Sequence, residues 1–164
     1  YTRPQDGFID TGSGGGIGWG LSDSMENAEV KEESIMDRKV YHTIYELKNG
    51  MGPAPIKTEK GWLQLAHGVR NTAAGLRYVL YLFLSDINDP SKIIGVGDNW
   101  ILQPEKPYEI TGSVHNVVFT CGAVPEDDGT VKIYWGGADT VMCVGTARVA
   151  DLVRLCLDKP RAAL

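Results

Sequence analysis

The sequence lacks the features that mark several large classes of protein. No apolar run approaches the length of a membrane span, and no signal peptide opens the chain. Basic residues are not in excess, because 16 Lys and Arg residues stand against 21 Asp and Glu residues and the two signs are interspersed. We therefore expect a cytoplasmic protein that binds neither nucleic acid nor a membrane.

Cysteine and histidine are also scarce. The three Cys residues are odd in number and show no Cys-x-x-Cys spacing, which predicts buried free thiols in a reducing compartment. The three His residues follow neither the His-x-His nor the His-Glu-x-x-His pattern, so we expect no metal site. There is no Gly-x-Ser-x-Gly motif, and the glycine-rich run 12–20 does not meet the Gly-x-Gly-x-x-Gly spacing of dinucleotide sites. We expect no cofactor.

What the sequence does contain is enough apolar material for one domain. The chain has 164 residues, of which 43% are hydrophobic, and we expect a single domain over 1–164 without a second one. Twenty glycines cluster at turns, which favours many short strands over long helices. Strands are expected at 17–21, 41–47, 52–58, 62–69, 76–84, 116–124, 131–135 and 141–146, and a helix at 147–157.

One predicted hairpin, over 52–69, organises the rest. Its turn contains Gly61, which is free to adopt a positive φ. Lys57 precedes the turn and His67 lies past the middle of the second strand. Two cationic or protonatable groups on one small hairpin would suit an anion such as phosphate. The alternative is a solvated Lys and a structural His, and from spacing alone it is the more common case.

A weak internal repeat indicates the architecture. The segment around Ser22 resembles the segment around Ser85, 63 residues later, and the turns at Gly61 and Gly129 lie 68 residues apart. Repeated strand–hairpin–strand units of this kind are typical of the blades of a β-propeller. The alternative is a β-sandwich in which the similarity arises by chance.

Several unusual strings occur in an order that resembles a known family. They are Thr-Arg-Pro-Gln-Asp-Gly-Phe at 2–8, Tyr-His-Thr-Ile-Tyr at 41–45, Gly-Pro-Ala-Pro-Ile-Lys-Thr at 52–58, His-Gly-Val-Arg-Asn at 67–71 and Ala-Asp-Thr at 138–140. Together they resemble glycoside hydrolase family 130, and within it the phosphorylases that act on mannosyl-glucose. The resemblance runs over nearly the whole chain.

The resemblance implies a fold and a reaction. The family fold is a five-bladed β-propeller, of which this chain would supply about the last three blades. The implied reaction is inverting phosphorolysis of a β-1,4-mannoside, in which inorganic phosphate is a co-substrate and α-mannose 1-phosphate is the product. An inverting hydrolase needs two carboxylates, but a phosphorylase can replace the second with a cation cluster because phosphate is already a nucleophile.

The resemblance also implies roles for four residues. Arg3 and His67 match positions that contact phosphate, and Lys57 is expected in the same pocket. Asp139 matches an acid that binds the mannose of the cleaved subsite. From the residues alone, Asp139 reads more simply as an aspartate that caps a turn.

The family's general acid and an Arg-Asn pair that also holds phosphate lie upstream of the Thr-Arg-Pro string. No residue of this chain matches them, and Asp6 and Asp10 follow that string and are not substitutes. We therefore expect the carboxy-terminal portion of a longer enzyme, inactive without its amino-terminal half, and a homo-oligomer. The alternatives are a β-mannoside hydrolase of the same fold and a non-catalytic propeller piece that binds sugars or a protein partner.

Overall fold

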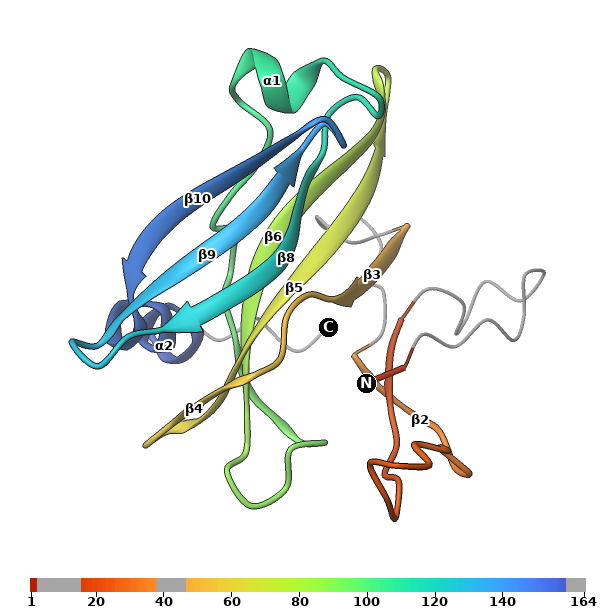
Figure 1. Cartoon of the computed structure of the whole chain (residues 1–164), viewed down its shortest axis with the longest axis vertical. Helices are drawn as coiled ribbons and strands as arrows, with labels where there is room; N and C mark the ends of the chain where they lie inside the picture. The colour runs from red at the N-terminus through yellow and green to blue at the C-terminus, as the bar shows by residue number, and fades with distance from the viewer. Residues whose placement is uncertain (3–15, 38–46, 159–164) are drawn as a thin grey trace.

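The described structure is mostly β. The computed structural model describes residues 1–2, 16–37 and 47–158, and its strands form three antiparallel sheets (Figure 1). The all-β class with a short helix near the carboxyl end, as predicted from the sequence, is confirmed. Arg3 and nearly all of the strand predicted at 41–47 lie outside the described residues.

The largest sheet is an up-and-down meander. Its strands, in spatial order, are β3 (Lys48–Met51), β5 (Gly61–Thr72), β6 (Gly75–Ser85) and β7 (Ile93–Val96), and β4 (Ile56–Thr58) pairs with β5 as well. β3 and β4 pair one after the other with β5, separated by a short irregular segment. They act as one interrupted strand, so the sheet has the four-stranded antiparallel form of a propeller blade.

The second sheet has three strands. They are β8 (Val118–Pro125), β9 (Thr130–Gly137) and β10 (Val141–Arg148), in that order across the sheet. The turn between β8 and β9 contains Gly129 with φ +80°, and Gly61, with φ +144°, is the first residue of β5 directly after the turn that joins it to β4. Both predicted turns are therefore present, and each uses a backbone conformation that favours glycine.

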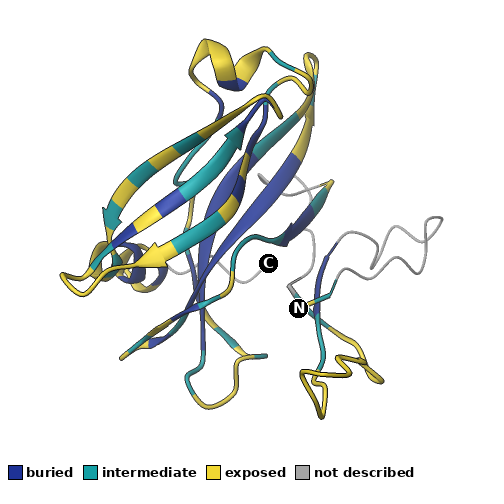
Figure 2. Cartoon of the chain, in the orientation of Figure 1, coloured by how far each residue is buried: buried dark blue, intermediate teal, exposed yellow. Residues whose placement is uncertain are grey.

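The two larger sheets face each other across the main core. This core combines β-sheet residues with those of α2 (Val149–Leu157), and Figure 2 shows the buried lengths of β5 and β6 behind β8 and β9. Its buried members are Ile56, Leu63, Leu65, Leu82, Leu84, Val131, Ile133, Leu152, Val153 and Cys156. The predicted helix begins two residues later than expected, because residues 147 and 148 still belong to β10.

Close approach of the two sheets requires glycine at one point. A Cβ on Gly52, between β3 and β4, would lie 2.3 Å from Cγ2 of Thr120 and 2.9 Å from the carbonyl oxygen of Leu65. The Gly52 N–H donates to that same carbonyl at 3.0 Å. β8 therefore crosses the irregular segment at a distance that no side chain would permit.

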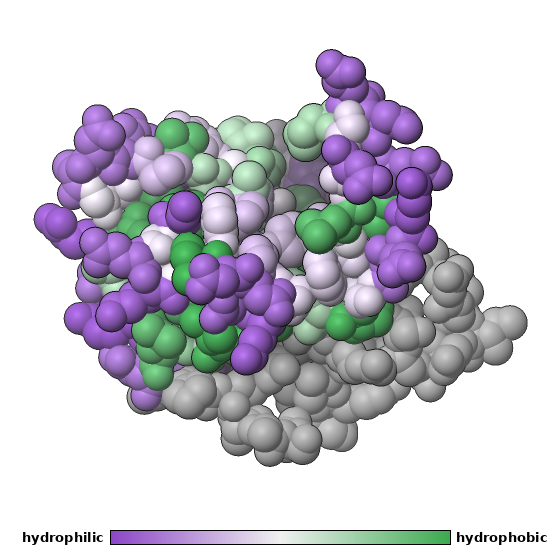
Figure 3. Space-filling view, turned by 90° about the horizontal axis from the view of Figure 1, so that it is seen from below, coloured by the Kyte–Doolittle hydropathy of each residue, from purple (hydrophilic) through white to green (hydrophobic). Residues whose placement is uncertain are grey.

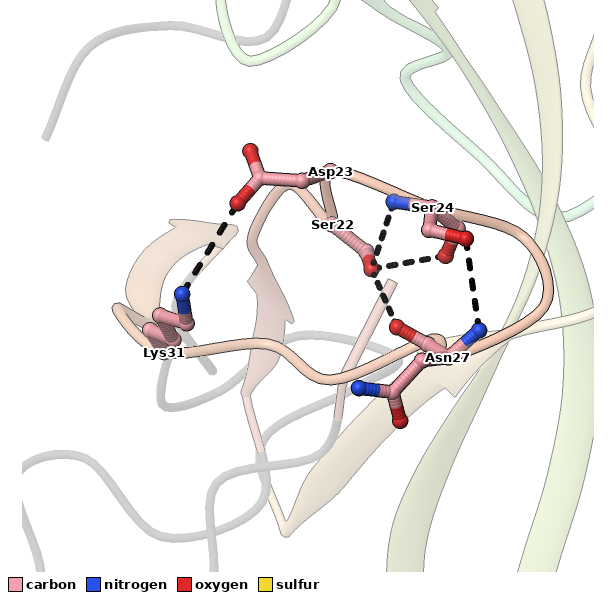
Figure 4. Close-up of polar contacts among 5 residues, drawn as sticks. All are labelled: Ser22, Asp23, Ser24, Asn27 and Lys31. Carbon is pink, nitrogen blue, oxygen red and sulfur yellow. Dashed lines mark hydrogen bonds and ion pairs between the residues drawn. The ribbon is translucent and has the colours of Figure 1, made fainter.

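The third sheet pairs β1 (Ile17–Trp19) with β2 (Ser34–Asp37). The loop between them is held by short-range polar contacts (Figure 4). The Ser22 hydroxyl donates to the carbonyl oxygens of Ser24 and Asn27 at 2.9 and 3.1 Å. Such hydroxyl-to-backbone bonds are typical of turns that follow a strand.

The repeat around Ser22 and Ser85 corresponds to a structural repeat. β1 leads through the Ser22 loop to its antiparallel partner β2, and β6 leads through a loop after Ser85 to its antiparallel partner β7. In the second loop, the Asp86 carboxylate accepts the N–H groups of Asn88 and Asp89 at 2.8 and 3.0 Å. Each copy thus has a strand, a polar loop held by hydrogen bonds between its own residues, and a return strand.

A short helix closes one end of the molecule. α1 (Pro107–Ile110) lies at the end of Figure 1 where the β5–β6 and β9–β10 turns also lie. No helix of the described residues is both long enough and apolar enough to span a membrane.

Candidate functional site

His67 lies in the middle of β5 and is almost entirely buried, with 3% of its surface exposed. Its ring is 4.6 Å from the ring of Phe119 on β8, measured between centroids. Gly50 on β3 pairs with His67, and a Cβ at Gly50 would lie 2.6 Å from Cε1 of the imidazole. Glycine at this position therefore makes the space that the imidazole occupies.

Lys57 lies elsewhere. It pairs with Trp62 across β4 and β5, and its Nζ lies 5.6 Å from the centroid of that indole ring. Because side chains alternate along a strand, Trp62 and His67 point to opposite faces of the sheet, about 16 Å apart along β5. Within the described chain, Lys57 and His67 are not brought together.

The structure places a different cation beside His67. Lys48 on β3 pairs with Val69, and Val69 pairs with Tyr78 on β6, so Lys48 and Tyr78 share the face of His67. The Nζ of Lys48 lies 5.4 Å from the centroid of the Tyr78 ring, and that ring lies 6.2 Å from the imidazole of His67. We call Lys48, His67, Tyr78 and Phe119 the His67 cluster.

Asp139 lies in the β9–β10 turn and is exposed. Ala138 and Asp139 both have positive φ, at 47° and 50°, and the Thr140 N–H donates to the Gly137 carbonyl at 3.0 Å. Ala138 occupies a left-handed position that costs a residue with a side chain about 1 kcal/mol. Asp139 therefore occupies the second left-handed position of this turn.

Asp139 lies at the same end of the fold as the His67 cluster. The Tyr78 N–H donates to the Asn116 carbonyl at 3.0 Å, and the Ala138 N–H donates to the Val117 carbonyl at 2.9 Å. One segment therefore joins β6 to the β9–β10 turn. Asn116 itself has a positive φ of 59°.

Glu109 in α1 holds that joining segment in place. It is buried, and its carboxylate accepts the N–H groups of Glu105 and Lys106 at 3.0 and 2.9 Å and the indole N–H of Trp135 at 3.1 Å. The Glu109 backbone carbonyl also accepts the N–H of Val117 at 3.0 Å. Burial by itself raises the pKa of Glu109, but these hydrogen bonds outweigh it and hold the pKa below its usual value.

The three Cys residues are free thiols, but of these only Cys156 is buried as predicted, whereas Cys143 is partly exposed and Cys121 is exposed. Nowhere in residues 1–2, 16–37 and 47–158 do three His, Cys, Asp or Glu side chains gather to hold a metal ion. Burial raises the pKa of Cys156 to about 12, so its thiol stays protonated at neutral pH. Burial, followed by the charge of Glu109, also raises the pKa of Cys143.

The end of the molecule opposite α1 carries a cavity of about 670 Å³. It lies between α2 and the turns that precede β5 and β9, and Figure 3 looks onto this end. Hydrophilic residues dominate the view, with hydrophobic patches between them. Charges of both signs line the cavity, and its Arg154 already pairs with Asp151 and Asp158.

Comparison with known proteins decides the family. A family profile described as beta-1,4-mannooligosaccharide phosphorylase, that of glycoside hydrolase family 130, matches residues 21–158. The chain belongs to glycoside hydrolase family 130. It is 55% identical over 161 residues to a 4-O-beta-D-mannosyl-D-glucose phosphorylase of Bacteroides fragilis, and the match covers 98% of this chain but 41% of that protein. The family assignment made from the sequence strings is thus confirmed.

The chain is also similar to other members of family 130. The chain is 46% identical over 99 residues to a beta-1,2-mannobiose phosphorylase of Thermoanaerobacter sp., covering 60% of this chain and 32% of that protein. The solved structure of a beta-1,2-mannobiose phosphorylase from Listeria innocua superimposes with a TM-score of 0.73 at 32% identity, covering 79% of this chain and 36% of that one. The chain therefore has the propeller-type fold of family 130 and spans less than half of the length of these relatives.

Lys48 was missed from the sequence for a physical reason. It lies 19 residues before His67, and the two become neighbours only through the pairing of β3 with β5. Family 130 membership makes this arrangement relevant, because the His67 cluster combines a primary amine, an imidazole and a phenol at one end of a blade. Such groups can hold an oxyanion through charge-assisted hydrogen bonds.

Proposed function

We propose that the protein containing this chain is an inverting β-mannoside phosphorylase. Phosphate attacks the anomeric carbon of mannosyl-glucose, the bond between that carbon and the glucose oxygen breaks, and a general acid gives that oxygen a proton. The products are α-mannose 1-phosphate and glucose. The observation that carries this proposal is the 55% identity to a 4-O-beta-D-mannosyl-D-glucose phosphorylase along 98% of the chain.

We assign phosphate binding to the His67 cluster and Arg3. Lys48 and His67 share one face of the large sheet, and Arg3 is carried over from the sequence resemblance. A phosphate dianion held beside the sugar needs no carboxylate to activate it, because it is the nucleophile. Lys57 remains a second candidate for this role, since the resemblance assigns it there.

We assign mannose binding to Asp139. Its turn lies at the end of the fold that also carries the His67 cluster, and its carboxylate can accept hydrogen bonds from sugar hydroxyls. The general acid belongs, on this proposal, to the amino-terminal part of the longer protein. A chain of residues 1–164 alone would then lack the proton donor and half of the substrate-binding groups.

The first test is the reaction itself. Full-length protein with mannosyl-glucose and phosphate should give α-mannose 1-phosphate, identified by phosphorus NMR, and no free mannose. Turnover should require phosphate. Release of mannose without phosphate would instead indicate a hydrolase of the same fold.

The second test separates the enzyme from a binding module. The chain of residues 1–164 should show no turnover, and adding the upstream segment as a separate polypeptide should restore it. General acid catalysis typically contributes about 10²–10⁴-fold, so its loss is easily measured. Turnover by the chain alone at the full-length rate would locate the acid within it, and Asp6, Asp10 and Asp139 would be the first residues to replace.

A further inference from the structure

The hydroxyl of Thr140 joins the β9–β10 turn to the segment between α1 and β8. It donates to the Ala138 carbonyl at 2.9 Å and accepts the N–H of Ser113 at 3.0 Å. The hydroxyl is thus used in both directions, as a donor within the turn and as an acceptor from the neighbouring segment. Thr140 directly follows Asp139 in the sequence, so these bonds act next to the residue assigned to mannose.

Glycine at position 112 allows the two segments to approach this closely. A Cβ on Gly112 would lie 2.4 Å from Oγ1 of Thr140, 2.5 Å from the Ala138 carbonyl oxygen and 2.7 Å from the Ala138 Cβ. The two Ala138 atoms are fixed by the backbone and cannot rotate away. Any side chain at position 112 would therefore displace the turn that carries Asp139.

The same segment holds a conformation that residues with side chains rarely adopt. Ala138 and Asp139 both have positive φ, which is unfavourable for such residues and persists only where the surrounding structure imposes it. Ala138 is fully buried, its N–H donates to the Val117 carbonyl at 2.9 Å, and its carbonyl accepts the N–H of Val114 at 3.1 Å. The backbone immediately before Asp139 is therefore fixed from both sides of the peptide.

We propose that Thr140 is a positioning residue for the reaction, and that its hydroxyl, packed against Gly112, holds the turn in the conformation in which Asp139 binds mannose. This inference rests on the mannose-binding role proposed above for Asp139. The segment is anchored to β6 by a separate bond, in which the Tyr78 N–H donates to the Asn116 carbonyl at 3.0 Å. Loss of the Thr140 hydroxyl should therefore disturb sugar binding and leave phosphate binding by the His67 cluster unchanged.

The test is steady-state kinetics of full-length variants, with mannosyl-glucose and phosphate varied in turn. Thr140→Val removes the hydroxyl with little change in volume and should lower kcat/KM for mannosyl-glucose by about fivefold or more, as expected for the loss of two neutral hydrogen bonds. The KM for phosphate should change by less than about twofold. Thr140→Ser keeps the hydroxyl and should retain the wild-type values. Gly112→Ala displaces the same turn sterically and should give the same split as Thr140→Val.

Thr130→Val is the matched control. The Thr130 hydroxyl donates to the Asp128 carboxylate at 2.6 Å in the β8–β9 turn, at the other end of β9. Its removal should leave both kinetic parameters unchanged. Equal losses toward mannosyl-glucose and phosphate in Thr140→Val would indicate a purely structural role and overturn the inference. An unchanged kcat/KM for mannosyl-glucose in Thr140→Val, or a Thr140→Ser variant as impaired as Thr140→Val, would also overturn it.

Asp139→Asn separates this inference from the proposed function. It should lower kcat/KM for mannosyl-glucose at least as much as Thr140→Val does. If Asp139→Asn has this effect and Thr140→Val has none, the positioning role alone is wrong. If Asp139→Asn has no effect, the mannose-binding assignment is wrong, and the positioning role with it.

Discussion

At the scale of single residues, the site depends on a glycine. Gly50 leaves room for the imidazole of His67, and a methyl group there would overlap it, at 2.6 Å from Cε1 and 2.8 Å from Nε2. The ring would have to move within a buried setting between β3, β6 and β8. Overpacking of this kind typically costs about 1–3 kcal/mol.

We therefore predict that Gly50→Ala in the full-length protein lowers the free energy of unfolding by about 1–3 kcal/mol and raises the KM for phosphate. Urea unfolding and initial-rate kinetics measure the two effects. Gly136→Ala is the matched control, since its nearest neighbour to the added carbon is a backbone oxygen at 3.9 Å. Equal stability of the two variants would show that His67 is not confined as described.

A second residue-scale prediction concerns Glu109. Its pKa is held below the ordinary value of 4.5, so the carboxylate stabilises the fold above that value and loses the effect as the pH falls through its lower folded pKa. At about pH 7, Glu109→Gln should destabilise the protein by about 1–3 kcal/mol, since the amide offers one acceptor oxygen to three donors.

The pH dependence checks the cause. The difference in unfolding free energy between wild type and Glu109→Gln should shrink as the pH is lowered from 7 toward about 3, because wild-type Glu109 then becomes neutral as well. Glu59→Gln, at an exposed turn position, should cost nothing at either end of this range. A difference that is constant with pH would contradict the role assigned to the charge.

At the scale of elements, the sequence predicted the turns and strands that are determined by neighbouring residues. The turns at Gly61 and Gly129 are where a glycine was needed for positive φ, and the apolar run at 76–84 is a buried strand of the large sheet. The repeat of 63 residues around Ser22 and Ser85 corresponds to two strand–loop–strand units. The turns and the buried strand depend on short stretches of local sequence, and the repeat depends on the comparison of two such stretches.

What could not be predicted depends on pairing between distant strands. β3 begins with Lys48, Asn49 and Gly50, which have low strand propensity, and β3 forms because it pairs with β5. Lys57 and His67 were predicted to share one pocket because they lie close together in the sequence, on one predicted hairpin. Period-two alternation along β5 then separates their faces.

The buried Glu109 was also missed. An isolated acid in a short polar segment gives no sign that it will bind the indole of Trp135, which lies 26 residues away in sequence. Asp139 was identified through its motif. The positive φ values of the β9–β10 turn could not be predicted from Ala-Asp, because Asn-Gly or Asp-Gly is the usual signal for a hairpin turn with positive φ.

At the scale of the whole molecule, one sheet edge is exposed. In the described chain β10 pairs on one side with β9, and Met142 and Val144 on it are 67% and 55% exposed. An apolar edge strand of this kind is a template for association with another chain.

We predict that a polypeptide of residues 1–164 self-associates, and that Met142→Lys with Val144→Lys reduces this association, because charges on an edge strand oppose pairing. Sedimentation velocity measures the effect. Ser113→Lys is the control, since it adds a charge at an exposed polar position outside β10. A stable monomer for the wild-type chain would contradict the prediction.

The proposed function depends above all on whether the His67 cluster, with Lys48 as its cation, binds phosphate. Lys48→Met and Lys57→Met remove the same charge from the two ends of one interrupted strand with little change in volume. The deciding measurement is the KM for phosphate of each full-length variant, together with the KM for mannosyl-glucose. On this assignment, we expect Lys48→Met to raise the phosphate KM by about tenfold or more and Lys57→Met to change it by less than about twofold. The reverse order, or an unchanged phosphate KM in Lys48→Met, would contradict it.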